Sequence, residues 1–449
     1  MKIVIAGAGE VGFHLAKLLS FESLDITLID MDKERLNYAE SHLDIKAVRG
    51  NAASLQVIRD ANVEKSDLFI AVTSEEATNL LICGLAKQMG CKRTIARIST
   101  IEYIKEECQI DFQQMGVDEL ISPEALAASE IQRLIDQSAF NNSYEFEGGA
   151  LSLIGTTLGT TAPFVGRSVK DAAAFFPDLH FMPIALQRKG TQYTIIPRGD
   201  TVFEANDNVF FITLPQGVEE IYKLTGKTKT EIKSVFLLGG GNIGLATARE
   251  LRAKDLQVTL VEQNKSRAYD IVEELPDVMV IHGDGRSAEL LEEENVESMD
   301  AFIAVTENSE TNIMSCLMAK SKEVKKTIAL VENMDYFELS QTIGIDTLIN
   351  KKLLTANTIF RYVRRGDVVD MTTLSNLNVE ILEFQVHQDS KVTGLNIRDI
   401  DFPRTATIGG VIKAGEGKIV LGDYKIEAGD RVVVCCLPKS IKRIEQLFR

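Results

Sequence analysis

The chain has 449 residues, of which 45% are hydrophobic and 25% charged. This is the composition of a globular protein that can bury several cores, and the length predicts two to four domains. A formal net charge of −16 argues against a nucleic-acid partner and against direct insertion into anionic lipid, because both need a basic surface.

No signal peptide is expected, because Met1 and Lys2 lead straight into a short apolar run. The uncharged stretch 148–166 contains five glycines, four threonines and a proline, so we interpret it as a strand with loops rather than a membrane helix. The six cysteines have neither disulfide nor zinc spacing and indicate reduced thiols in a cytoplasmic protein without a metal site; they are Cys83, Cys91, Cys108, Cys316, Cys435 and Cys436.

The first predicted elements are a strand at 3–6 and a helix at 11–19, with Gly7, Gly9 and Gly12 between them. One G-x-G-x-x-G motif is weak evidence. Further strand-like runs follow at 26–29, 47–48, 68–72 and 94–97, with a helical stretch at 33–42. Strands that alternate with amphipathic helices predict βαβ units and a parallel sheet.

The chain then repeats itself. Gly239, Gly241 and Gly244 follow the first three glycines at an offset of 232 residues, and Glu262 follows Asp30 at the same offset. Residues 50–52 match 283–285, 71–73 match 304–306 and, beyond this part, 165–171 resemble 393–399. A period of this length indicates tandem duplication of a two-domain unit, not a solenoid.

The predicted fold is therefore α/β, with two tandem units, each a Rossmann-like doubly wound parallel sheet followed by a small β-rich α+β domain. Strand-like runs at 208–212 and 431–436 belong to the small domains, each of which ends in a short helix, and 225–231 reads as the linker between the units. The expected domains are 1–135, 140–225, 232–362 and 370–449.

The glycines and the two acids predict nucleotide binding. In such a turn the glycines permit a tight bend, close approach to a pyrophosphate and close helix–strand packing, and the helix N-terminus attracts phosphate. Asp30 and Glu262 lie 18 residues after the third glycine of each motif, near the position of a ribose-binding acid. A carboxylate there repels a 2′-phosphate, and the two residues that follow each acid include no arginine, so NADP is disfavoured.

Other candidate ligand residues follow the later strands. Thr73 and Ser74 lie where open α/β sheets bind ligands, Asn51 and Asp284 could meet an adenine edge, and Arg97 could reach phosphate or ribose. For each, a role in structuring its loop is an equal alternative. Because Leu330 replaces Arg97 and Glu307 replaces Ser74 in the second copy, the two sites should differ, and the second should hold phosphate less well.

An enzyme is not expected. A hydride-transfer site needs a positioned acid or base, yet no tyrosine is followed four residues later by lysine, and neither His14 nor His282 has an evident acidic partner. No nucleophile elbow or P-loop is present. A ligand sensor is favoured, and an NAD-dependent oxidoreductase remains the alternative.

The phrases IVIAGAGEVG, LID, RGNA and AVTS, followed by VGRSV and RGD with DNVFFI, resemble the regulators of potassium conductance (RCK or KTN domains). Two whole units in one soluble chain are similar to the cytosolic NAD-binding regulatory subunits of bacterial Trk potassium uptake systems. The resemblance implies a nucleotide-responsive gating ring, a homo-oligomer of four chains, bound peripherally on the cytoplasmic face of the membrane to a potassium transporter subunit of the TrkH or TrkG type.

It also implies two sets of ligand residues. The first site would comprise Gly7, Ala8, Gly9, Glu10, Val11, Gly12, Asp30, Asn51, Ala52, Thr73, Ser74 and Arg97. The second would comprise Gly239, Gly240, Gly241, Asn242, Ile243, Gly244, Glu262, Gly283, Asp284 and Thr306. The implied ligand is NAD or NADH, with ATP or another adenine nucleotide as a competitor. Glu10 and Asn242 stand where ATP-preferring single-unit relatives carry arginine, which favours NAD(H) in the first site.

Overall fold

The computed structural model describes residues 1–20, 24–105, 107–136, 142–174, 180–189, 191, 193–225, 231–333, 336, 344–363, 368–374 and 379–449. Its contacts divide the chain into two units. One unit contains residues 1–132 and 233–363, and the other contains residues 133–232 and 364–449.

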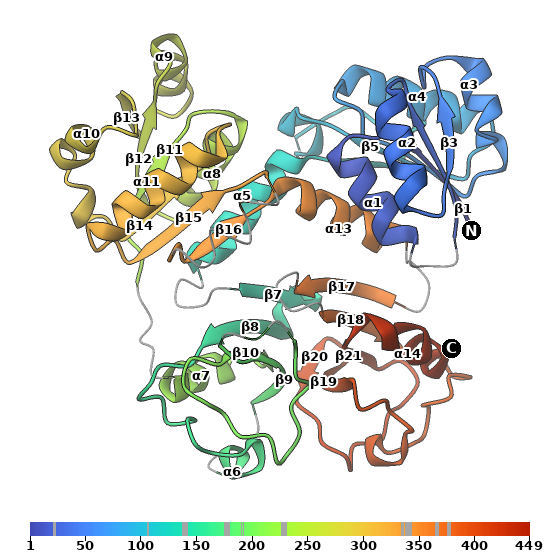
Figure 1. Cartoon of the computed structure of the whole chain (residues 1–449), viewed down its shortest axis with the longest axis vertical. Helices are drawn as coiled ribbons and strands as arrows, with labels where there is room; N and C mark the ends of the chain where they lie inside the picture. The colour runs from blue at the N-terminus through green and yellow to red at the C-terminus, as the bar shows by residue number, and fades with distance from the viewer. Residues whose placement is uncertain are drawn as a thin grey trace. The chain divides into compact units, whose positions relative to one another are not determined.

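The first unit begins with a six-stranded, fully parallel sheet (Figure 1). Its strand order is β3-β2-β1-β4-β5-β6. The strands are β1 (Lys2–Ala6), β2 (Asp25–Asp30), β3 (Lys46–Arg49), β4 (Leu68–Ala71), β5 (Arg93–Arg97) and β6 (Glu119–Ile121). The helices are α1 (Glu10–Ser20), α2 (Lys33–His42), α3 (Leu55–Asp60), α4 (Glu76–Gln88) and α5 (Pro123–Asp136). This strand order is that of a doubly wound nucleotide-binding fold.

The second half of the same unit repeats the arrangement with the order β13-β12-β11-β14-β15-β16. Its strands are β11 (Ser234–Leu238), β12 (Gln257–Glu262), β13 (Met279–His282), β14 (Ala301–Ala304), β15 (Lys326–Leu330) and β16 (Thr347–Ile349). Its helices are α8 (Asn242–Arg252), α9 (Lys265–Glu274), α10 (Ala288–Glu293), α11 (Ser309–Ser321) and α13 (Lys351–Val363). The predicted parallel sheets and their duplication are confirmed.

Both sheets are buried on two faces, which explains their nearly continuous apolar strands. All four residues of β4 and of β14 are buried. At the start of the second sheet, Asp300 accepts hydrogen bonds from the backbone N–H groups of Lys233 (2.8 Å) and Ser234 (3.1 Å) and pairs with Lys325 (2.7 Å). Burial alone would raise the pKa of Asp300, but these donors outweigh it and lower the pKa to about 2.

The two halves of this unit exchange their last helices. α13 follows the second sheet but packs against α1 of the first half (Figure 1), and Tyr362 near its end donates to Oε1 of Glu119 in β6 (2.8 Å). In return, Ser129 of α5 donates to Oε1 of Glu250 in α8 (3.3 Å). Nothing in the repeat pattern indicates this exchange.

The other unit contains two antiparallel sheets, of order β7-β8-β10-β9 and β17-β18-β21-β19-β20. Their strands are β7 (Asn142–Phe146), β8 (Leu151–Thr157), β9 (Phe181–Gln187), β10 (Asn208–Thr213), β17 (Val368–Leu374), β18 (Val379–Gln385), β19 (Ala406–Lys413), β20 (Glu416–Lys418) and β21 (Arg431–Cys436). The helices are α6 (Val169–Ala173), α7 (Gly217–Thr225) and α14 (Ile441–Phe448). The predicted small α+β domains, each ending in a short helix, are confirmed.

One core joins these two sheets, since Leu153, Ile184 and Phe210 of the first pack in the same cluster as Ile381 and Val433 of the second. As expected, Cys435 and Cys436 are buried strand residues, and the uncharged stretch 148–166 forms β8 and turns. The predicted linker lies largely outside the described residues. Within the part of the chain that the structure describes, no helix has the length and apolar character needed to span a membrane.

Candidate functional site

The first glycine turn joins β1 to α1 and leaves no room for side chains at two of its three glycines. Gly7 has φ +111°, and a Cβ atom there would lie 2.8 Å from the carbonyl oxygen of Val72. At Gly12 a Cβ atom would lie 1.8 Å from the carbonyl oxygen of Gly7. At Gly9 the nearest heavy atom would be Nη1 of Arg35, 3.9 Å away. Gly7 and Gly12 therefore shape the turn, and Gly9 leaves open space above it.

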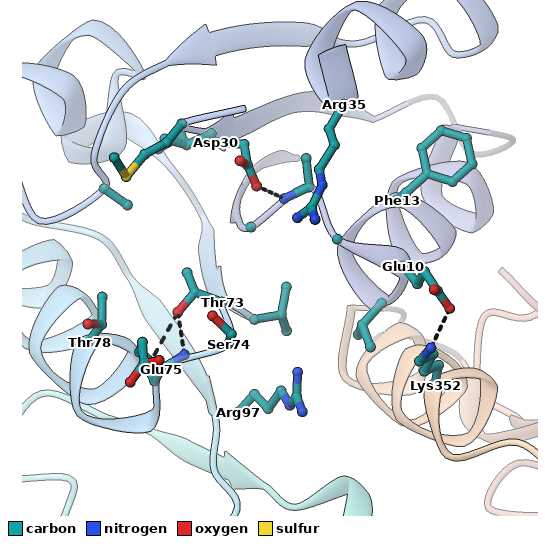
Figure 2. Close-up of a pocket in the computed structure, with 18 of the residues that line it drawn as sticks. Glu10, Phe13, Asp30, Arg35, Thr73, Ser74, Glu75, Thr78, Arg97 and Lys352 are labelled. Carbon is teal, nitrogen blue, oxygen red and sulfur yellow. Dashed lines mark hydrogen bonds and ion pairs between the residues drawn. The ribbon is translucent and has the colours of Figure 1, made fainter. Parts of the chain in front are cut away.

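Asp30, at the end of β2, holds this turn in place. Its Oδ2 accepts from the backbone N–H of Ala8 (2.5 Å) (Figure 2). Its Oδ1 accepts from the backbone N–H of Asp32 (2.8 Å). The carboxylate retains lone pairs on both oxygens. The acid that the sequence singles out thus lies against the glycine turn, where it can also accept hydrogen bonds from a ligand.

Thr73 and Ser74 follow β4 at the same sheet edge, and a buried asparagine on α4 shapes their loop. Oδ1 of Asn79 accepts from the backbone N–H (3.0 Å) and the hydroxyl (2.7 Å) of Thr73, and its Nδ2 donates to the carbonyl oxygens of Thr73 (3.2 Å) and Arg97 (2.9 Å). Asn312 follows Asn79 at an offset of 233 residues, but this repetition does not reveal the role.

A cavity of about 1040 Å³ lies over the turn. Every predicted residue of the first site lines it except Gly12, which is packed beneath. The cavity also contains residues that the sequence analysis missed, among them Phe13, Arg35, Tyr38, Pro123, Glu332, Lys351 and Lys352. Arg35 could have been found, because it aligns with Arg267 at the repeat offset.

The cavity brings together cations from different parts of the chain. The half-buried Arg97 at the end of β5 points into it (Figure 2), and among the described residues no hydrogen bond or ion pair engages its guanidinium. Arg35 makes a long ion pair with Asp32 (3.4 Å). The two residues that follow Asp30 include no arginine, but the structure places Arg35 in the same cavity. The carboxylate of Asp30 is therefore the feature that opposes a 2′-phosphate.

Asn51 and Ala52 also line the cavity. Oδ1 of Asn51 accepts from the backbone N–H of Ala53 (2.9 Å), so this side chain shapes its own turn. His14, on α1 below the turn, is largely buried. Burial, helped by the charge of Lys17, lowers its pKa to about 4, so it is neutral at physiological pH.

The second glycine turn has the same construction. Gly239 has φ +109°, and a Cβ atom at Gly244 would lie 1.8 Å from the carbonyl oxygen of Gly239. Oε2 of Glu262 accepts from the backbone N–H of Gly240 (2.8 Å). Here, however, Nε of Arg267 donates to the carbonyl oxygen of Gly240 (3.1 Å). Gly241 and Asn242 are exposed at the start of α8, and Ile243 is buried.

The remaining residues of the predicted second site also lie at the carboxyl edge of their sheet. A Cβ atom at Gly283 would lie 2.2 Å from Cδ1 of Leu290, so this glycine serves packing. Asp284 pairs with Arg286 (2.7 Å), whose hydrogen bonds lower the pKa of the acid. Its side chain is therefore committed to its own loop.

Thr306 repeats the arrangement of the first half. Asn312, fully buried on α11, accepts at Oδ1 from the backbone N–H (2.9 Å) and the hydroxyl (2.7 Å) of Thr306. Its Nδ2 donates to the carbonyl oxygens of Thr306 (2.9 Å) and Leu330 (2.8 Å).

Fold and turns together define a class: a tandem pair of Rossmann-type nucleotide-binding domains, each followed by a small antiparallel domain. Comparison with known proteins agrees. The TrkA-N domain family matches residues 3–123 and 235–351, and the TrkA-C domain family matches residues 154–226 and 381–449. These matches cover most of the chain. The TrkA-N matches contain the two parallel sheets, and the TrkA-C matches contain most strands of the two antiparallel sheets.

Full-length relatives agree with the domain matches. The chain is 36% identical to the Trk system potassium uptake protein TrkA of Halomonas elongata, over 100% of this chain and 99% of that protein. It is 34% identical to TrkA of Vibrio alginolyticus, with the same coverage. The chain therefore belongs to the TrkA family of Trk system potassium uptake proteins.

Two solved structures share the fold. The GsuK RCK domain superposes with a TM-score of 0.61 at 15% identity, covering 100% of this chain and 94% of that chain. The GsuK channel bound to NAD superposes with a TM-score of 0.61 at 16% identity, covering 100% of this chain and 78% of that chain.

Proposed function

We propose that this chain is a nucleotide-sensing regulatory subunit that gates a membrane potassium uptake channel or transporter in response to NAD(H), with ATP or another adenine nucleotide as a competing ligand. The observation that carries the proposal is one cavity in which an open glycine turn, the Asp30 carboxylate and the unengaged Arg97 guanidinium lie together. The names of the relatives support potassium uptake, and the NAD-bound channel of the same fold supports the ligand.

Each part of the cavity matches a part of a dinucleotide. The turn at Gly9 and the N-terminus of α1 suit a diphosphate, since backbone N–H groups and the helix dipole favour anions there. Arg97 can supply a charge-assisted hydrogen bond to the same group. Asp30 can accept from ribose hydroxyls, and its charge opposes a 2′-phosphate.

Regulation follows if the ligand binds one arrangement of the chain better than another. The proposed assembly is a homotetrameric ring on the cytoplasmic face of the membrane, held there by a TrkH- or TrkG-like transporter subunit. The fused pair of nucleotide-binding domains and the exchanged helices α5 and α13 would transmit ligand occupancy between the halves of each chain.

Calorimetric titration of the full chain with NADH, NAD, ATP and NADPH tests ligand choice. We expect NADH and NAD to bind, NADPH to bind poorly, and Asp30→Ala to weaken NADH binding by about tenfold or more. Asp44→Ala removes an equal charge from an exposed position outside the cavity and should leave binding unchanged. If NADPH binds best, the role given to Asp30 is wrong.

A NAD-dependent oxidoreductase is the competing function. It predicts turnover of NADH with a carbonyl substrate, whereas a regulator binds NADH without consuming it. Reconstitution with the potassium transporter in vesicles, followed by potassium flux with and without NADH, separates the two. A potassium flux that is the same with and without NADH, together with NADH oxidation, would support the oxidoreductase function and refute the regulatory function.

A further inference from the structure

The cavity over the first glycine turn has a second wall, which comes from the other half of the chain. Lys351 and Lys352 begin α13, after the second sheet, and Glu332 follows β15. All three line the same cavity as Gly9 and Glu10 of the first half. A ligand in the first site therefore meets side chains encoded more than 300 residues further along the chain.

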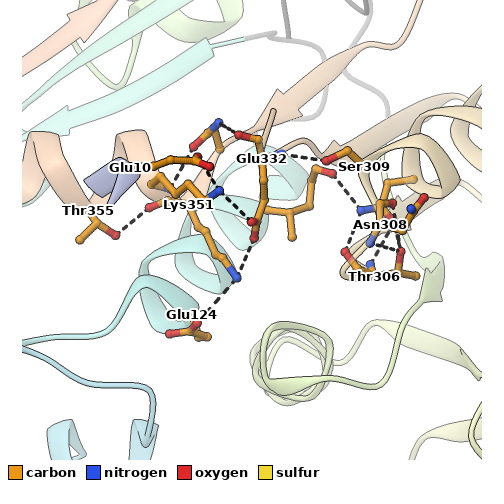
Figure 3. Close-up of polar contacts among 12 residues, drawn as sticks. Glu10, Glu124, Thr306, Asn308, Ser309, Glu332, Lys351 and Thr355 are labelled. Atoms are coloured by element: carbon orange, nitrogen blue, oxygen red, sulfur yellow. Dashed lines mark hydrogen bonds and ion pairs between the residues drawn. The ribbon is translucent and has the colours of Figure 1, made fainter. Parts of the chain in front are cut away.

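These residues form a chain of ion pairs (Figure 3). Nζ of Lys352 lies 2.6 Å from Oε2 of Glu10 and 3.1 Å from Oε2 of Glu332. Nζ of Lys351 lies 2.7 Å from Oε1 of Glu332 and 3.9 Å from Oε1 of Glu124. Glu332 is thus held by both lysines, whereas among the described residues Glu10 pairs with Lys352 alone.

The partners of Lys352 differ in how firmly they are placed. The side chain of Glu10 is 68% exposed, and that of Glu332 is 26% exposed. An exposed carboxylate on a flexible side chain contributes little to an ion pair and exchanges its partner readily. The pair between Lys352 and Glu10 is therefore the contact that an incoming anion would displace first.

The position of Glu10 decides which anion this would be. Glu10 is the first residue of α1, beside the open Gly9, where the phosphates of a bound nucleotide are expected. A phosphate chain extending past the turn would meet Glu10, whose charge opposes it, and Lys352, whose charge attracts it. Glu10 alone predicts exclusion of a triphosphate, but the structure supplies a lysine that neutralises Glu10 and can replace it as the partner of the phosphate.

We propose that Lys352, supplied by the second half of the chain, is a ligand-binding residue of the first nucleotide site, and that the terminal phosphates of an adenosine di- or triphosphate take Lys352 from Glu10. This rests on the proposed function in one respect, that an adenine nucleotide occupies the first site. Lys352 then distinguishes nucleotides by the number of their phosphates. Because it lies at the start of α13, this contact links the ligand to the second half of the protein.

Titration of the full chain with AMP, ADP and ATP tests this inference. Lys352→Gln should weaken ATP binding by about tenfold, as expected for loss of a charged hydrogen bond, and should change AMP binding by less than about twofold. Glu10→Gln should act in the opposite direction and tighten ATP binding, because it frees Lys352 and removes the opposing charge.

Lys322→Gln is a matched control. The side chain of Lys322 is 24% exposed, as is that of Lys352. Its Nζ lies 2.9 Å from Oε1 of the exposed Glu292, and neither residue lines the cavity. It should leave the affinities for all three nucleotides unchanged. Melting temperatures of the variants, with AMP binding as a second check, show whether the site stays folded.

The outcomes separate this inference from the proposed function. If nucleotides bind and Asp30→Ala weakens them, but Lys352→Gln affects AMP and ATP equally or neither, the role of Lys352 is refuted and the first site stands. If Glu10→Gln weakens ATP binding, the displacement is also refuted. If no adenine nucleotide binds the wild-type chain, both proposals fail.

Discussion

Asn312 offers a test of how the ligand-side loops are supported, because it can be replaced without changing its shape. Its Oδ1 accepts two hydrogen bonds from Thr306 and its Nδ2 donates to the carbonyl oxygens of Thr306 and Leu330. In Asn312→Asp the acceptor remains, but an ionised carboxylate cannot donate. The carbonyl oxygens of the part-buried Thr306 and the buried Leu330 then lose these donors and face a negative charge.

Each buried polar group left without a partner costs about 1–3 kcal/mol, so Asn312→Asp should destabilise the protein by about 2–6 kcal/mol. Uptake of a proton would restore one donor. The destabilisation should therefore decrease as the pH is lowered, because burial raises the pKa of the new acid.

Asn308→Asp provides the control, with the same substitution four residues earlier. The side chain of Asn308 caps α11 by accepting from the backbone N–H of Thr311 (2.6 Å), a role that aspartate fills equally well. Its stability should stay within about 0.5 kcal/mol of wild type. Urea unfolding of both variants measures the difference, and equal midpoints would refute the account of Asn312.

Three further predictions concern other parts of the chain. Gly12→Ala should destabilise the protein by about 2 kcal/mol through overpacking, since the new Cβ atom meets the Gly7 carbonyl oxygen at 1.8 Å. Gly9→Ala should cost less than about 1 kcal/mol and mainly weaken nucleotide binding. Equal effects of the two variants in urea unfolding and in calorimetric titration would contradict this. Asp300→Asn should lower the free energy of unfolding by about 2 kcal/mol at neutral pH. Because the pKa of Asp300 in the folded protein is lowered from 3.8 to about 2, this loss should shrink as the pH falls through that range. A difference in unfolding free energy that does not depend on pH would contradict the prediction. A thiol reagent should modify the half-buried Cys108 first and the five buried cysteines only on unfolding. Mass spectrometry of the labelled native protein identifies the modified thiols, and a buried thiol that reacted as fast as Cys108 would contradict this prediction.

The fold could be predicted from the sequence because its determinants are local and occur twice. Gly7 and Gly12 are required by backbone contacts within one strand–turn–helix. The same spacing at Gly239 and Gly244 shows that the glycine motif does not occur by chance. Alternating buried strands and amphipathic helices then leave few arrangements other than a doubly wound sheet. The ends of the strands, and hence the positions of Asp30 and Thr73, follow from that topology.

What could not be predicted depends on contacts between residues distant in sequence. The motif sets the position of Asp30, but no motif indicates that Lys352 lies beside Glu10, because that contact requires α13 to pack on the other half. Asn79 illustrates a different limit. Its repetition was visible, yet four hydrogen bonds to one loop and a neighbouring strand become evident only when the backbone is placed.

The exchange of α5 and α13 has a consequence for how such a chain can evolve. In an assembly of separate identical units, every substitution would appear in both sites at once. In a fused chain each exchanged helix is a separate stretch of sequence, held near its target at an effective concentration of the order of millimolar whatever the abundance of the protein. α13 begins with Lys351 and Lys352, and α5 begins with Pro123 and Glu124. Duplication followed by fusion has thus let the two helix starts acquire different charges independently of each other.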